Sequence, residues 1–133
     1  MNGKQVSCQV LVLALFAAVN PCRLLTRSDF RAVQGEAYVE AVRTLHSGGE
    51  DVEQCLFRLP TASKSVTLEI TPRKTWPFGD GKSKWTGNRA NGALYVLAPS
   101  AVLRISVGGA EDVEAKTARA KELARRAMRR MAR

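Results

Sequence analysis

A run of ten apolar residues, positions 10–19, follows the basic start Met1-Asn2-Gly3-Lys4. A basic beginning before a short apolar stretch is typical of a secretory signal peptide. The run is shorter than the roughly 20 residues that a helix needs to cross a bilayer, so it does not predict a spanning helix. We therefore expect residues 1–20 to be a signal peptide or an N-terminal apolar anchor, and residues 21–133 to form a single α+β domain.

Two alternatives stay open for this segment. Signal-peptide cleavage favours a small side chain three positions before the cut, but Leu15 and Phe16 stand there for cuts after Ala17 and Ala18. An uncleaved form, loosely anchored in the membrane, is therefore one alternative. The other is that the apolar run is a buried strand or helix of a cytosolic domain.

The three cysteines help to decide whether the protein is exported or cytosolic. Cys8 lies in the leader and would be removed with it, which leaves Cys22 and Cys55. Two cysteines in a small exported domain predict a disulfide. That bridge would close a loop of about 34 residues and stabilise the domain by roughly 3 to 4 kcal/mol. The alternative is two buried free thiols in a cytosolic fold.

The clearest predicted element is a short helix that begins at Thr26 or Arg27. Thr26 can cap this helix, and Asp29 can bond back to the cap. Gln34-Gly35 ends it with the glycine that a left-handed C-terminal cap favours.

Strands are predicted in the middle of the chain. Residues 36–45 fit either a strand or a second helix, and residues 72–92 are predicted to be a long loop. The four clear strand patterns are Val52–Leu59, Ser65–Thr71, Ala93–Leu97 and Ala101–Val107.

A long helix is predicted from Glu111 to about Arg130, because its apolar positions recur at helical spacing and give it one face that can lie across a sheet. The expected fold class is therefore α+β. Its antiparallel sheet should have four to five strands, with a short N-terminal helix and a long C-terminal helix packed on one face and solvent on the other.

Catalysis is not expected. His46 is the only histidine, and no serine or cysteine nucleophile is placed to partner it. No spacing of cysteines and histidines suits a zinc site. Gly81-Lys82-Ser83 lacks the earlier glycine of a phosphate-binding loop, because Trp76 occupies that position. We expect a non-enzymatic protein with no metal and no cofactor.

The long loop predicts a ligand-binding surface, because it mixes aromatic and basic side chains that can stack on bases or sugars and neutralise phosphates. The alternative is that its tryptophans pack over the sheet edge while its lysines keep it soluble. The candidate ligand-binding residues are Arg73, Lys74, Trp76, Lys82, Lys84, Trp85 and Arg89.

The C-terminal helix predicts a second surface. The net charge is +9, and residues 116–133 carry eight basic residues against Glu122 alone. Such a surface could attract an acidic protein or anionic headgroups of a membrane, or it could be a solvated face that complements the helix dipole. The candidate basic-surface residues are Arg119, Arg125, Arg126, Arg129 and Arg130.

Residues 21–35 read Pro-Cys-Arg-Leu-Leu-Thr-Arg-Ser-Asp-Phe-Arg-Ala-Val-Gln-Gly, and Gln54-Cys55 heads a predicted strand. Over residues 21–71 this arrangement resembles small secreted and lipoprotein domains of unknown function from bacteria, in which a cysteine precedes a Leu-Leu-Thr helix ending in glycine and a second cysteine opens the next strand. The resemblance implies export, a disulfide and an α+β fold, and it implies no activity. Neither Cys8 nor Cys22 stands in a lipobox, which is a departure from the lipoproteins of the group.

These features together predict an exported protein, periplasmic or extracellular, that acts as an interaction or ligand-binding module of the cell envelope. Its expected partners are an acidic protein, an anionic envelope polymer or a membrane surface. The alternative is a cytosolic nucleic-acid-binding protein that uses its basic C-terminal helix and its loop rich in tryptophan and lysine.

Overall fold

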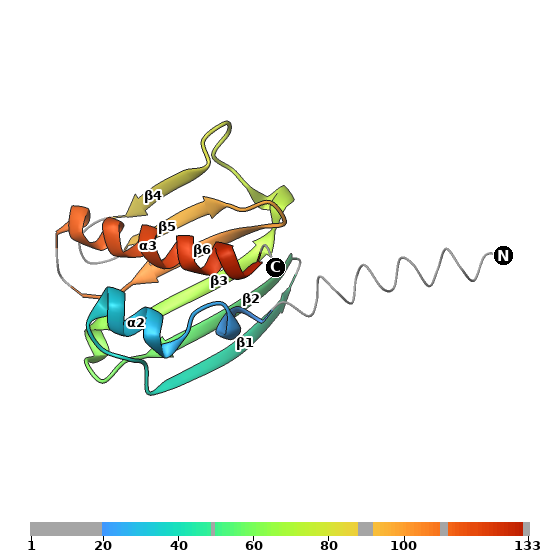
Figure 1. The fold of residues 1–133 in the computed structure, drawn as a ribbon. Coiled ribbons are helices and arrows are strands. Elements are labelled where there is room, and N and C mark those ends of the chain that lie inside the picture. Colours follow the sequence, from blue (N-terminus) through green and yellow to red (C-terminus); the bar gives the residue numbers. More distant parts are fainter. Residues whose placement is uncertain (1–19, 49, 88–91, 110–111, 132–133) are drawn as a thin grey trace.

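The computed structural model describes residues 20–131 except 49, 88–91 and 110–111 (Figure 1). The apolar run at 10–19 lies outside the described residues. No helix in the described part of the chain has the length and apolar character needed to span a membrane.

The described residues form one six-stranded antiparallel sheet with the strand order β1-β2-β3-β6-β5-β4. Its strands are β1 (Glu40–Gly48), β2 (Glu50–Arg58), β3 (Val66–Pro72), β4 (Ser83–Gly87), β5 (Gly92–Leu97) and β6 (Ala101–Val107). The helices are α2 (Arg27–Gln34) and α3 (Val113–Met131), with short 3-10 turns η1 (Pro21–Arg23), η2 (Ala62–Lys64) and η3 (Arg73–Thr75). The α+β class with a short and a long helix is confirmed.

The sheet is larger than the four to five strands expected from the sequence. The segment 36–45, open between strand and helix, contributes most of β1. The segment 72–92, expected to be a loop, contains η3 and the edge strand β4. The sequence did not predict β4 because its five residues, of which only Trp85 and Thr86 are half-buried, show too little alternation of apolar and polar side chains.

Helix α2 begins and ends as the sequence predicts. Thr26 is its N-cap, and a reciprocal capping box joins Thr26 to Asp29: the Asp29 backbone N–H donates to Thr26 Oγ1, and the Thr26 N–H donates to the Asp29 carboxylate. Gly35 closes the helix with a φ of 84°, in the left-handed region that glycine adopts without steric cost.

The core lies between one face of the sheet and the two helices (Figure 1). Phe57, Leu68 and Ile105 are fully buried on the sheet side, and Leu123 is fully buried on α3. The face that α3 turns to the sheet also carries three buried alanines, Ala120, Ala124 and Ala127. Their short side chains let the helix backbone approach the sheet closely, which makes these positions sensitive to added volume.

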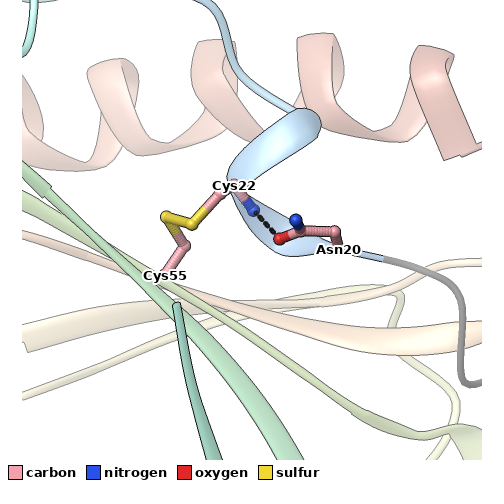
Figure 2. Close-up of a disulfide and its surroundings, with 3 residues drawn as sticks. All are labelled: Asn20, Cys22 and Cys55. Carbon is pink, nitrogen blue, oxygen red and sulfur yellow. Dashed lines mark hydrogen bonds between the residues drawn. A yellow bond between two sulfur atoms is a disulfide. The ribbon is translucent and has the colours of Figure 1, made fainter. Parts of the chain in front are cut away.

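A disulfide ties the start of the described chain to the sheet. Cys22 in η1 is bonded to Cys55 in β2, with a Cα–Cα distance of 5.2 Å (Figure 2). Asn20 caps η1, since its side-chain oxygen accepts from the Cys22 backbone N–H at 2.9 Å. The predicted pairing of these two cysteines is confirmed.

Candidate functional site

Among the described residues, both helices lie on one face of the sheet, and we call the other face the open face. On β3, Val66, Leu68 and Ile70 are buried toward the helices, and the alternate residues Thr67, Glu69 and Thr71 are half-buried on the other side. Strand pairing extends this alternation across all six strands, because paired residues share a face. One open-face row therefore runs through Thr44, Gln54, Glu69, Arg104, Tyr95 and Lys84.

The centre of this row is an organised cluster. Arg104 Nε donates to the Tyr95 hydroxyl at 3.0 Å, and the Arg104 guanidinium carbon lies 5.7 Å from the centroid of the Tyr95 ring. On its other side, Arg104 Nη1 lies 3.6 Å from a carboxylate oxygen of Glu69. Glu69 and Tyr95 thus hold the guanidinium in place on the open face, with 35% of the Arg104 side chain exposed.

The loop after β3 extends the cluster with aromatic rings. Phe78 packs on Tyr95 with ring centroids 5.1 Å apart, and Trp76 packs edge-on against Phe78 at 5.2 Å. The Trp76 indole N–H donates to the Gly79 carbonyl, which helps to fix the loop. The aromatic series Trp76–Phe78–Tyr95 therefore ends at the Arg104 guanidinium.

A groove of about 390 Å³ lies on the open face. Its middle is formed by the short side chains of Thr67, Ser106 and Ala93, which are paired in one row across β3, β6 and β5. The full lining is Leu56, Ser65, Thr67, Thr86, Gly87, Gly92, Ala93, Arg104, Ser106, Val107 and Gly108. Arg104 therefore belongs to both the aromatic cluster and the groove.

The structure separates the seven loop residues that the sequence grouped. Trp76 joins the open-face cluster, and Lys84 lies opposite Tyr95 on the edge strand. Trp85 is on the helix side, where it packs against the core; a Cβ on Gly92 would lie 2.3 Å from its ring. Arg89 is outside the described residues.

The other three loop residues, Arg73, Lys74 and Lys82, lie at one end of the sheet, around the turn that joins β5 to β6. Arg73 Nε donates to the Ala98 carbonyl at 3.3 Å, and the Lys82 carbonyl accepts from the Leu97 N–H at 2.9 Å.

The last turns of α3 reach the same turn. An apolar groove of about 310 Å³ between them is lined by Pro99, Ser100, Arg125, Met128, Arg129 and Met131. We call this region the basic end of the domain. Arg125 and Arg129 line its groove, and Arg73, Lys74 and Lys82 belong to segments beside the turn that joins β5 to β6.

The basic-surface residues of α3 have different environments. Arg126 Nη1 lies 3.1 Å from Asp29 Oδ1, and Arg130 Nη1 lies 2.6 Å from Asp29 Oδ2. Burial raises the pKa of Asp29, but its hydrogen bonds with Thr26, Arg130 and Arg126 outweigh this, so the pKa is below its ordinary value. Arg126 and Arg130 therefore join α3 to the capping box of α2.

The remaining three arginines differ in exposure. Arg125 is 65% exposed and forms an ion pair with Glu122, and Arg129 is also exposed. Arg119 is only half-exposed, with its Nε and Nη2 atoms buried.

Phe78 of the open-face cluster lies in the predicted binding loop but was not among the candidate residues. Three further members, the strand residues Glu69, Tyr95 and Arg104, lie outside that loop and were not proposed from the sequence either. One signal in the sequence does mark all three: Glu69 stands between the buried Leu68 and Ile70, Tyr95 between Leu94 and Val96, and Arg104 between Leu103 and Ile105. A polar residue flanked by two buried ones in a strand points to the opposite face.

In the part of the chain that the structure describes, no three side chains of the metal-binding types cluster together. The side chain of His46 lies outside the described residues.

Comparisons with models of known families, with curated proteins and with solved structures found no match to this chain.

Proposed function

We propose that this protein is an exported, non-enzymatic binding module of the cell envelope, which holds an anionic, sugar-containing polymer on the open face of its sheet. The observation that carries the proposal is the cluster of Trp76, Phe78, Tyr95 and Arg104 on the face without a covering helix. Aromatic rings can stack on the apolar faces of sugars, and an oriented guanidinium can pair with a carboxylate or phosphate.

The shape and charge of the face support an extended ligand. The groove continues from Arg104 past the small side chains of Ser106 and Ala93 toward Thr86 on the edge strand. Lys84, exposed on the same edge strand and paired with Tyr95 across the sheet, supplies a second positive charge on this face. A polymer could therefore stack on the rings and contact both cations without entering a closed pocket.

The export part of the proposal is supported by the apolar start, by the disulfide and by the resemblance over residues 21–71. Its test is the intact mass of the protein recovered from the host's cell envelope, alkylated with and without prior reduction. We expect a mass that lacks the first 17 to 20 residues and cysteines that are alkylated only after reduction. A full-length cytosolic protein with three free cysteines would contradict it.

The binding part is tested by titrating the protein with polygalacturonate, an anionic polysaccharide, and with dextran, a neutral one. We expect polygalacturonate to bind with an affinity that falls as salt is added, and dextran to bind more weakly. Trp76→Ala should weaken polygalacturonate binding by about 5- to 30-fold, the effect of losing one stacking contact. Lys84→Gln should flatten the salt dependence.

Arg31→Gln is the matched control, because Arg31 is an exposed arginine of α2, on the other side of the sheet. This variant should bind like the wild type. Equal binding by the Trp76→Ala and Arg31→Gln variants would place the ligand elsewhere and reject the open face as the site.

A single-stranded nucleic acid is the second candidate ligand, and the same series of rings beside Arg104 favours it, since bases also stack on aromatic side chains. A thymidine oligonucleotide used as a competitor distinguishes the two. Displacement of polygalacturonate at equal or lower charge concentration would favour the cytosolic nucleic-acid-binding alternative. Failure to displace it would favour the envelope polymer.

A further inference from the structure

We propose that the basic end of the domain docks on an anionic phospholipid membrane, with Arg125 and Arg129 on the headgroups and the methionines of the adjoining groove at the boundary with the acyl chains. This contact is separate from the open face and does not depend on the polymer proposed there.

The first observation is the pairing of charge with apolar surface. Arg125 and Arg129 are one helical turn apart on the exposed side of α3, and both line the groove that holds Met128 and Met131. Both methionines are only partly buried against the core. Cations beside exposed apolar side chains are the combination with which surface helices bind anionic membranes, because headgroups and acyl chains are then satisfied together.

The second observation is that further cations gather at the same end from other parts of the chain. Arg73 is anchored on the carbonyl of Ala98, and Pro99 and Ser100, which follow Ala98, form the groove wall. Lys74 is exposed in the same short turn η3. A membrane is a broad anionic surface that can contact all of these cations at once, whereas a small anion would engage only one or two.

The third observation is where the described chain begins. Arg130, in the last turn of α3, donates to the carbonyl of Leu24 at 2.8 Å, so the segment that follows Asn20 lies beside the end of α3. Figure 1 shows the start of the described chain and the end of α3 on the same side of the domain. The apolar run 10–19 immediately precedes Asn20 in the sequence. A membrane contact at this end is therefore compatible with an N-terminal anchor and with its removal.

The test is flotation of the full chain with phosphatidylcholine vesicles, with and without phosphatidylglycerol. Binding to pure phosphatidylcholine measures what the apolar N-terminal run contributes, and the increase caused by phosphatidylglycerol measures what the basic end contributes. The double variant Arg125→Gln/Arg129→Gln should lower the partition coefficient on phosphatidylglycerol vesicles by about 10- to 30-fold. It should leave binding to phosphatidylcholine unchanged.

The matched control is the double variant Arg31→Gln/Arg43→Gln, which removes the same net charge from α2 and β1. Arg43 forms an ion pair with Glu53 as Arg125 does with Glu122, so each double variant breaks one exposed ion pair. We expect the control to float like the wild type. Equal loss in both double variants would show a general effect of net charge and would overturn the proposal, as would wild-type flotation of Arg125→Gln/Arg129→Gln.

The apolar part of the contact has its own test. Met128→Gln keeps every charge. It should still weaken flotation on phosphatidylglycerol vesicles by several-fold, because a polar amide replaces the apolar side chain that contacts the boundary with the acyl chains. Unchanged flotation of Met128→Gln would contradict the apolar contact. Added salt should release the wild type progressively and the Arg125→Gln/Arg129→Gln variant much less.

Discussion

Arg130, in the last turn of α3, donates to the carboxylate of Asp29 in the first turn of α2 at 2.6 Å, across 101 residues of sequence. Arg126 reaches the other oxygen of the same carboxylate at 3.1 Å. Asp29 is 3% exposed and also accepts the Thr26 N–H of the capping box. One carboxylate thus completes the first turn of one helix and holds the last turns of the other.

Replacing this carboxylate should destabilise the domain. We expect Asp29→Asn to lower the free energy of unfolding by about 2 to 4 kcal/mol, because two guanidinium groups lose their shared anion and the cap is weakened. Urea denaturation of the variant and the wild type measures the difference. Asp80→Asn, at an exposed loop carboxylate, is the control and should change stability little. A similar small change for Asp29→Asn would contradict this account of the helix contact.

The same carboxylate predicts a dependence on pH. The pKa of Asp29 in the folded protein is below its ordinary value, which is about 3.9 in an unfolded chain. Its contribution to stability is therefore fully present above about pH 3.9 and is lost as the pH falls through the folded pKa. The stability difference between wild type and Asp29→Asn should shrink as urea denaturation is repeated at lower pH. A difference that grows on acidification has the wrong sign for this mechanism.

The disulfide should carry a large share of the stability of so small a domain. We expect the double variant Cys22→Ser/Cys55→Ser to unfold with a free energy lower by about 3 to 4 kcal/mol, because the unfolded chain gains the freedom of a loop of about 34 residues. Reduction of the wild type should have a comparable effect. Cys8→Ser is the control, and its stability should equal that of the wild type. If the double variant denatures at the same urea concentration as the control, the bridge contributes nothing.

The close approach of α3 to the sheet predicts intolerance to larger side chains. Ala124 is 1% exposed and faces the core, and Ala118 is exposed on the same helix. Ala124→Leu should cost about 1 to 3 kcal/mol through overpacking, and Ala118→Leu should be nearly neutral. Thermal unfolding of the two variants compares the same change at a buried and at an exposed site. Equal melting temperatures would mean that α3 does not lie tightly against the sheet.

Local signals in the sequence were sufficient to predict the structural features that depend on neighbouring residues. The capping box of Thr26 and Asp29 and the terminal Gly35 lie within ten residues of one another, and the structure contains both. The pairing of Cys22 with Cys55 followed from the small number of cysteines. The edge strand β4 was missed because its residues alternate too briefly within a segment rich in glycine and proline.

The candidate sites depend on the register of paired strands and on contacts between distant parts of the chain, neither of which a single sequence specifies. Tyr95 and Arg104 are partners because β5 and β6 pair in one particular register. The loop residues Trp76 and Trp85 share a composition signal, but the chain turns between them, so one ring lies on the open face and the other packs against the core. Likewise, Arg126 and Arg130 look like a solvated basic face until Asp29, far away in the sequence, is placed beside them.

The most direct test of the binding proposal is to map the ligand on the protein by nuclear magnetic resonance. The isotope-labelled protein is titrated with polygalacturonate, and the shift of each backbone amide is followed. We expect the largest shifts at Tyr95, Arg104 and Lys84, with little change along α2. Largest shifts on the helices, or none at saturating polymer, would contradict the proposal that the open face is the binding surface.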